Sequence, residues 1–587
     1  MGALSFSPAA KILPPLNNHS SRARNPMNIN LIPAQVEPLE SRIAPATLVV
    51  NVLTDPTTFT PHQLSLREAI QDAIGHGSTT IVFSPTLHGS LTLANGAGPL
   101  SITNENLTII GPGGGKIVIE PWAFARTQIF TIDTSKVSIS GLTLADGNTT
   151  SATGGAIYSQ GPLTISNCLI ADSSAQSGGA IFDSTTSGAF VMTNSLVVGN
   201  SATSGFGGGL DVSATGGISI TGSKIIGNTA SDGEGGAYLI APSNGTGNIV
   251  VANSIFYGNT ESGGGALGTN DGTTLPAKTV IVNTIVTGNV STGGGTSGIF
   301  LSTANEDSVV VSGSSLLNNS SSGRGGGMYL SGAGAVTIVG SHFSGNTSPG
   351  GGGIYIDNAA TSVTIQGSTI LNNVSTGSGG GILVDTSGVN LTLAGTTLAG
   401  NHAASNGGGL FLSTNTGITK ITGSTFSGNQ ALENAGGAYI AGSGNVSVSG
   451  TKIVSNFSGG VGGGLQLNSS GIHTVLSGNI IANNNAQGNG GGLYIGGTGT
   501  FLISSGSFTG NFSSADAGGI FIGTTASGTI QTPAVHITGN QAVGYFETGA
   551  GVDHASGSTG TVTMHTKYVT GNLGSGKVDN YSGSFTP

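Results

Sequence analysis

The feature of this 587-residue chain that most limits its fold is a short phrase that returns at a nearly constant spacing. The phrase is an apolar residue, two further residues and then Asn, and successive Asn positions lie 27 to 32 residues apart. We expect Asp146 and Asp172 to be earlier, degenerate copies of this Asn. The Asn positions are Asn200, Asn228, Asn259, Asn289, Asn319, Asn346, Asn373, Asn401, Asn429, Asn456, Asn484, Asn511, Asn540 and Asn572.

Two further segments fill each period. One is a glycine-rich phrase that ends in an apolar residue, such as Gly-Gly-Ala-Ile at 154–157 or Gly-Gly-Gly-Ile at 351–354. The other is a short alternating strand such as Val336-Thr337-Ile338. Three short strands in about 28 residues, with glycine turns and no helical period, are typical of one coil of a parallel β-helix. The repeats therefore predict an all-β, right-handed parallel β-helix of the pectate-lyase-like type, with about sixteen coils, over residues 141–575.

The repeated Asn and Gly residues have a structural explanation that needs no ligand. Equivalent Asn side chains on successive coils can hydrogen-bond to one another as a ladder, amide to amide. Glycine supplies backbone angles that residues with a Cβ resist. One coil cannot bury its apolar face alone, whereas a stack of coils can.

Composition agrees with a repetitive β protein. The chain has 105 glycines without a strict Gly-X-Y period, which excludes collagen, and only 7% of its residues are charged. Its 36% hydrophobic content is higher than that of a typical disordered chain. The net charge of −10 and the absence of a Lys/Arg cluster argue against nucleic acid as a partner.

The sequence says little about targeting. No apolar run approaches the length of a membrane span, and residues 1–32 contain no clean apolar core of a secretory signal. The single cysteine, Cys168, excludes an intrachain disulfide, and we expect it to be a small buried core residue. We expect residues 1–46 to be a disordered or targeting segment and residues 576–587 to be a C-terminal tail.

The paired Gly-Gly-Ala-Ile and Phe-x-x-Asn phrases resemble those of the chlamydial polymorphic outer membrane protein family, over about residues 150–575. In that family the repeats form the passenger of an autotransporter, so the resemblance implies surface exposure and adhesion. About fifteen residues follow the last coil, which is too few for the strands of a transmembrane barrel, so we do not expect autotransport by a barrel of this chain's own.

Residues 47–140 are expected to form an N-terminal cap and the first, irregular coils. Residues 64–74 resemble the Cys-Ser-Leu-Arg-Glu-Ala-Ile segment that precedes many bacterial β-helices, with Leu64 in place of Cys, and residues 36–46 resemble a short element of bacterial surface proteins. Physically, residues 65–74 predict an amphipathic helix with Ser65 as N-cap and Gly75 at its end. The predicted apolar face of this helix is Leu66, Ile70, Ala73 and Ile74.

The first predicted strands are 79–83, 91–93, 107–110 and 116–120. Trp122, the only tryptophan, follows the last of these strands. We expect it to lie in the core, with a ligand platform as the alternative.

One group of residues predicts a ligand site. Asp357 and Asp385 occupy the same position in successive repeats, so they should lie one coil apart, about 5 Å. Alternation places Ile354 and Ile356 on one face of the strand and Tyr355 and Asp357 on the other. The same outward track should carry Tyr329, Phe411, Tyr494 and Phe521.

Outward aromatic rings beside two carboxylates are typical of sites that hold a sugar or a cation. The candidate ligand-binding residues are therefore Tyr329, Tyr355, Asp357, Asp385 and Phe411. The structural alternative is that stacked aromatic rings stabilise the sheet.

These observations predict a secreted or cell-surface β-helix that acts without catalysis, as an adhesin or a cell-envelope scaffold. We expect no cofactor, no metal, no catalytic residue and no transmembrane segment, with polysaccharide or another cell-surface molecule as the partner. The alternative is a carbohydrate-active enzyme, a polysaccharide lyase or glycoside hydrolase, because its paired carboxylates would be the acid and base.

Overall fold

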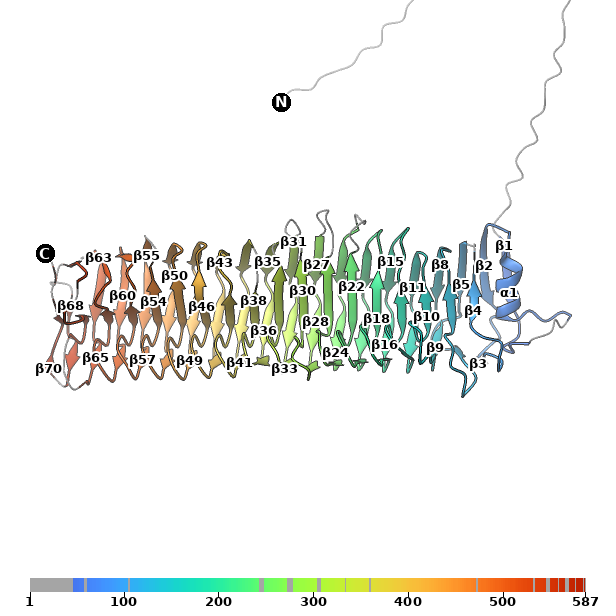
Figure 1. The fold of residues 1–587 in the computed structure, drawn as a ribbon, viewed down its shortest axis with the longest axis horizontal. Helices are drawn as coiled ribbons and strands as arrows, with labels where there is room; N and C mark the ends of the chain where they lie inside the picture. The colour runs from blue at the N-terminus through green and yellow to red at the C-terminus, as the bar shows by residue number, and fades with distance from the viewer. Residues whose placement is uncertain are drawn as a thin grey trace, which may run out of the picture. The chain divides into compact units, whose positions relative to one another are not determined.

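The fold was analysed in a computed structural model of the chain. The structure describes residues 46–585 with gaps at 57–60, 104–105, 242–246, 272–277, 304–307, 333, 358–360, 471–472, 532–533, 545–548, 558, 565–568, 576 and 584. The predicted targeting segment 1–46 therefore lies outside the described residues, except for its last position. The described part is an elongated stack of short strands, with the α-helix at the N-terminal end (Figure 1).

The strands form a right-handed parallel β-solenoid of about 17 turns. Equivalent strands of successive coils pair in parallel and build four sheets of 16 to 19 strands. We name these sheets A to D by a member of each: β35 (Ala335–Val339) in A, β36 (His342–Ser344) in B, β34 (Met328–Gly332) in C and β37 (Thr347–Ser348) in D. The predicted fold class is confirmed, but each repeat contains a fourth strand of two residues after the Asn, which the sequence pattern did not reveal.

Alternation along the strands places the apolar residues inside. In β38 (Ile354–Asp357) the side chains of Ile354 and Ile356 belong to the continuous hydrophobic core. The register is kept across these coils, since Ile354 pairs with Met328 on one side and Ile382 on the other. Because each coil buries its apolar face against both neighbours, the stack gains stability that a single coil lacks.

The Asn ladder predicted from the repeats is present. The Nδ2 of Asn373 donates to Oδ1 of Asn401 at 3.0 Å, and the backbone N–H of Asn373 donates to the same oxygen at 3.0 Å. Asn401 makes the same pair of bonds to Asn429, and both side chains are fully buried. Each amide thus satisfies buried polar groups on both adjacent coils.

Asp146 and Asp172 are not members of this ladder, contrary to our expectation. The residue that donates to Asn200 Oδ1 is Ser173, through its backbone N–H at 2.9 Å. Asp172 lies one residue earlier, in a turn with φ of 52°, and Asp146 has φ of 59° at the corresponding turn. Short polar side chains tolerate this left-handed conformation, which glycine takes at the same turn in other coils.

A second ladder of hydroxyls lines the corner between sheets A and B. The backbone N–H of Ser314 donates to Ser341 Oγ at 3.3 Å, and that of Ser341 donates to Ser368 Oγ at 3.1 Å. The sequence alone does not reveal this ladder, because Ser and Thr are common throughout the chain.

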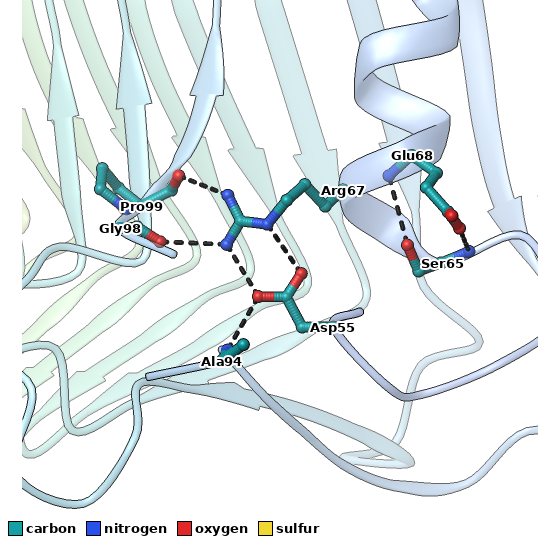
Figure 2. Close-up of polar contacts among 7 residues, drawn as sticks. All are labelled: Asp55, Ser65, Arg67, Glu68, Ala94, Gly98 and Pro99. Atoms are coloured by element: carbon teal, nitrogen blue, oxygen red, sulfur yellow. Dashed lines mark hydrogen bonds and ion pairs between the residues drawn. The ribbon is translucent and has the colours of Figure 1, made fainter. Parts of the chain in front are cut away.

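The N-terminal end of the stack carries the helix α1 (Leu66–Ala73). Ser65 is its N-cap, as predicted, and forms a capping box with Glu68 (Figure 2). The buried face is Leu66, Ala69, Ile70 and Ala73. Ile74 was wrongly assigned to this face: it is the C-cap, and its side chain is 52% exposed because the chain is already extended there.

Arg67 connects this helix to the loops below it. Its guanidinium donates to both carboxylate oxygens of Asp55, at 2.7 and 2.8 Å, and to the carbonyls of Gly98 and Pro99 (Figure 2). Asp55 also accepts from the backbone N–H of Ala94 at 2.8 Å. The pair is largely buried and its hydrogen bonds are shared with backbone groups, so it fixes the cap to the first coils.

The first coils and the last residues belong to the same stack. The four predicted N-terminal strands correspond to β2 (Ser78–Phe83), β3 (Gly89–Thr92), β5 (Asn106–Ile110) and β6 (Ile117–Glu120). Within the segment expected to be a C-terminal tail, β71 (Tyr581–Ser582) pairs in parallel with β66 (Val552–His554). This segment therefore contributes a strand to the final turn.

Candidate functional site

The predicted ligand residues lie on sheet C, on the outward face of four successive coils. Tyr329 pairs in register with Tyr355, and Asp357 pairs with Asp385 on the next strand, β42 (Ile382–Asp385). The Tyr329 hydroxyl donates to Asp357 Oδ2 at 3.0 Å, and the Tyr355 hydroxyl donates to Asp385 Oδ2 at 3.1 Å. The structure therefore brings four of the five candidates into one connected group.

The aromatic rings of this group are packed rather than free. Tyr355 is fully buried, and its ring lies 5.0 Å from that of Tyr329 in an edge-to-face arrangement. Phe411, on β46 (Leu410–Asn415), is separated from Tyr355 by Leu383 and stacks instead on Tyr439 at 4.9 Å. These contacts are those of the structural alternative, in which outward aromatic rings stabilise the sheet.

Arg324 completes the group and was missed at the sequence level. Its guanidinium hydrogen-bonds the Tyr355 hydroxyl, lies 5.0 Å from the centre of that ring, and is 3.8 and 3.9 Å from the carboxylates of Asp357 and Asp385. Arg324 precedes the glycine phrase, so only knowledge of the corner geometry reveals that its side chain reaches the next two coils. We call Arg324, Tyr329, Tyr355, Asp357 and Asp385 the arginine cluster.

Electrostatics in the arginine cluster keep the tyrosines neutral. Burial raises the pKa of Tyr329 to about 12, and its hydrogen bond to Asp357 adds to the effect. Burial and the charges of Asp357 and Asp385 also raise the pKa of Tyr355. Neutral tyrosines that donate to carboxylates are positioning groups, and the polar surface that this cluster presents to solvent comes from Asp385 and Arg324, with side chains 49% and 55% exposed.

A second candidate site surrounds Trp122, near the N-terminal end. Trp122 is 47% exposed, so our expectation that it lies in the core is wrong. It follows β6 in a segment that leaves the stack, and Phe124 in the same segment is 88% exposed. Beside Trp122 lies a cleft of about 520 Å³, which is lined by Thr92, Glu120, Pro121, Trp122, Ala123, Ala125, Asp146, Asn148 and Asp172.

Three carboxylates line this cleft, one from each of three successive coils. Glu120 ends β6, Asp146 follows β9 (Thr143–Ala145), and Asp172 follows β12 (Leu169–Ala171). The register of β6 with β9 and of β9 with β12 stacks these strand ends. Burial raises the pKa of Asp146, and the negative charges of Asp172 and Glu120 raise it further.

Neither the arginine cluster nor the cleft at Trp122 has the arrangement of side chains that is typical of a metal centre. Among the described residues, no group of three or more His, Cys, Asp or Glu side chains is arranged to hold a metal ion. Cys168 is buried, as expected, and burial raises the pKa of its thiol. Over the same part of the chain, no helix has the length and apolar character required to cross a membrane.

Comparisons with known proteins agree with the fold. A family model described as the right-handed β-helix region matches residues 277–418 and 352–542. Among solved structures, the A-module of the mannuronan C-5 epimerase AlgE4 from Azotobacter vinelandii is similar, with 13% identity and a TM-score of 0.32 over 75% of this chain and 92% of that chain. No curated protein matches the sequence. The strand topology and the family model together identify the chain as a β-helix repeat protein, and this likeness extends to the fold alone.

Proposed function

We propose that this chain is a secreted or surface-displayed β-helix that binds polysaccharide without catalysis, as an adhesin or a cell-envelope scaffold. The observation that carries the proposal is the cleft at Trp122, where a half-exposed indole lies beside polar side chains from three coils. Indole rings pack against the apolar faces of sugar rings, and carboxylates accept hydrogen bonds from their hydroxyls. Two other clefts in the described part of the chain, beside Cys168 and beside His554, have no exposed aromatic ring in their lining.

Display outside the cell is part of the proposal. It is supported by the resemblance of the repeats to the chlamydial polymorphic outer membrane proteins and by the low content of charged residues. We propose the arginine cluster as a second contact for the same polymer, because Asp385 and Arg324 keep polar atoms in solvent on sheet C. Phe411 is a weaker candidate, since its ring is already stacked on Tyr439.

The test is binding of the full chain to a panel of immobilised neutral, acidic and amino polysaccharides. We expect Trp122→Ala to weaken binding to the retained polymer at least tenfold, because one lost stacking platform is worth about 1.4 kcal/mol or more. Phe206→Ala is the matched control, since Phe206 is 42% exposed but lies outside the cleft. Equal binding by the wild type and Trp122→Ala would exclude this cleft as the site.

A carbohydrate-active enzyme is the second candidate function. It is favoured by the pKa of Asp146, which burial and the neighbouring carboxylates raise, because a carboxyl group that keeps its proton can be a general acid. Reducing-end release from the same polysaccharides distinguishes the two functions. Turnover that disappears in Asp146→Asn, but not in Asp357→Asn/Asp385→Asn, would replace the non-catalytic proposal with an enzyme whose site is the cleft.

A further inference from the structure

The corner between sheets D and C has a regular hydrogen-bond pattern. The residue two positions after the ladder Asn points into this corner and is usually Ala or Ser. Where it is Ser, its hydroxyl donates to backbone carbonyls that face into the corner. Ser375 Oγ lies 2.9 Å from the Ser378 carbonyl and 3.1 Å from that of Pro349, and Ser458 Oγ lies 2.8 Å from the Glu433 carbonyl. The corner thus presents acceptors, and a hydroxyl donor satisfies them.

One coil reverses this pattern. Glu261, on β25 (Thr260–Glu261), pairs with Ala230 on one side and Ser291 on the other. Its side chain is 1% exposed, and neither carboxylate oxygen has a hydrogen-bond partner. The hydroxyl of Ser291 is also buried without a partner. An acceptor has therefore replaced a donor in a corner that already presents acceptors.

The oxygen atoms in this corner lie close together. A Cβ on Gly235 would be 2.7 Å from Glu261 Oε2 and 2.7 Å from the Thr260 carbonyl oxygen, so both atoms lie against the same glycine. Ser291 is the register partner of Glu261 on the next coil, which brings its hydroxyl to the same corner. Buried polar atoms without partners are rare in proteins, and a bound ion is one of the explanations for them.

Further acidic residues surround the corner. Glu234 is 3% exposed, its Oε2 has no hydrogen-bond partner, and a Cβ on Gly264 would lie 2.7 Å from its Oε1. Burial raises the pKa of Glu234 to about 8, and the charges of Asp211 and Asp232 add to this effect. Burial also raises the pKa of Glu261, with a contribution from the charge of Glu234. Across the described residues, the ion pairs of Arg67 and Arg324 involve none of these four acids.

We propose that this corner binds a hard cation, for which Ca²⁺ is the best-suited probe, through the Glu261 carboxylate, the Ser291 hydroxyl and the Thr260 carbonyl. Calcium takes six to eight oxygen ligands, and carboxylate, carbonyl, hydroxyl and water oxygens all serve. Glu234 and the acids beside it lie outside this ligand set. A site with a single carboxylate binds weakly, so we expect a Kd on the order of 10⁻⁴ to 10⁻³ M, as in extracellular modules.

The repeat itself supplies the test variant. Glu261→Ser restores the residue found at this position in other coils, so it should fold and form the regular corner. The full chain, freed of cations with a chelator, is titrated with Ca²⁺ by calorimetry. Amide exchange of residues 229–236 and 260–265 is followed in the same samples. We expect Ca²⁺ to slow exchange in both segments of the wild type and to bind Glu261→Ser at least tenfold more weakly.

Glu433→Gln is the control, because Glu433 is an exposed acid in an equivalent corner and accepts hydrogen bonds from Ser405 and Asn406. It should respond to Ca²⁺ like the wild type. Equal Ca²⁺ binding by the wild type and Glu261→Ser would overturn the proposal. The proposal would also be overturned if Ca²⁺ left amide exchange at this corner unchanged and acidification alone slowed it. A proton on Glu261 would then satisfy the carboxylate.

Discussion

The coils from Asn319 to Asn511 and the coils from Asn228 to Asn319 form the same fold by different means. In the first region the ladder Asn residues are 27 or 28 positions apart, and the corner before sheet C has glycine or alanine with positive φ, as at Gly351 and Ala435. In the second region the spacing is 30 or 31, and the same corner position is occupied by Glu234, Gly264 and Thr296 without positive φ.

The difference shows where polar groups go unsatisfied. The Asn ladder is continuous through both regions, with Asn259 bonded to Asn289 as Asn373 is bonded to Asn401. In the longer coils, both carboxylate oxygens of the buried Glu261 lack a hydrogen-bond partner, and so does Oε2 of Glu234. Outside these coils, Asp183 and Glu68 each have one such oxygen. Changes of coil length therefore leave the ladder intact and alter the corners.

The largest expected effect comes from interrupting the ladder in either region. Asn401→Ala leaves the buried Asn373 amide and the Ile370 carbonyl without partners. Because each such group costs about 1–3 kcal/mol, we expect a loss of about 2–6 kcal/mol, seen as faster amide exchange in the coils on both sides. Asn259→Ala should lose a similar amount, because its ladder contacts are the same.

Asn390→Ala is the control for both variants, since Asn390 is exposed on sheet A and makes a single backbone contact, to Ile418. A loss below about 1 kcal/mol is expected there. If Asn401→Ala were as mild as Asn390→Ala, hydrophobic burial would hold the coils together without help from the ladder.

The fold was predictable because the Asn and Gly positions repeat with a period that only stacked coils explain. The capping helix was predictable from Ser65 and Glu68, whose capping box is a local pattern. The position of Asp172 was not, because a one-residue offset from the ladder is invisible until the register is known. Trp122 was misplaced for a related reason: apolar character predicts burial on average, and nothing in the sequence marks the segment that leaves the stack.

The candidate site was predictable only in part. Equal phase correctly placed Asp357 beside Asp385, and alternation placed Tyr355 on the outward face. The contact of Arg324 with Tyr355 and the burial of Tyr355 could not be predicted, because both depend on the conformation of the corner before sheet C. Contacts that the repeat register fixes can be predicted from the sequence. Contacts at irregular corners depend on loop conformations that the sequence pattern does not specify.

An effect of comparable size is a fall in stability as pH rises from about 4 to about 8. Burial raises the pKa of Glu234 to about 8 and that of Asp211 to about 7, both in or beside the longer coils. Between the unfolded and folded pKa values, the folded state therefore binds more protons than the unfolded state. The stabilisation from these protons is complete below pH 4 and is lost as the pH rises toward 8. Each group contributes up to about 1.4 kcal/mol per pH unit.

Thermal unfolding between pH 4 and 9, with local amide exchange, checks this dependence. The double variant Glu234→Gln/Asp211→Asn should show a weaker dependence of stability on pH. The dependence that remains would come from other groups, such as Asp183, whose pKa burial raises to about 7. Exchange in the coils from Asn319 to Asn511 should change least with pH. A slope that is equal along the whole stack would place the titrating groups outside the longer coils.

The smallest effect is expected at the arginine cluster, where the charges are partly in solvent. Arg324→Ala removes the ion pairs to Asp357 and Asp385 at 3.8 and 3.9 Å, and half-exposed pairs at such distances are worth about 0.2–1 kcal/mol. At 1 M salt, exposed charges are screened within about 3 Å, so the loss of stability in Arg324→Ala should nearly vanish in 1 M NaCl, while that in Asn401→Ala should persist.

The variant Arg324→Lys separates the charge of the guanidinium from its shape, because it keeps the charge but cannot reproduce the planar contact with Tyr355. If both Arg324 variants lost more than about 2 kcal/mol of unfolding free energy at high salt, the arginine cluster would be a structural element like the ladder. Its contribution to stability would then not come from exposed charges.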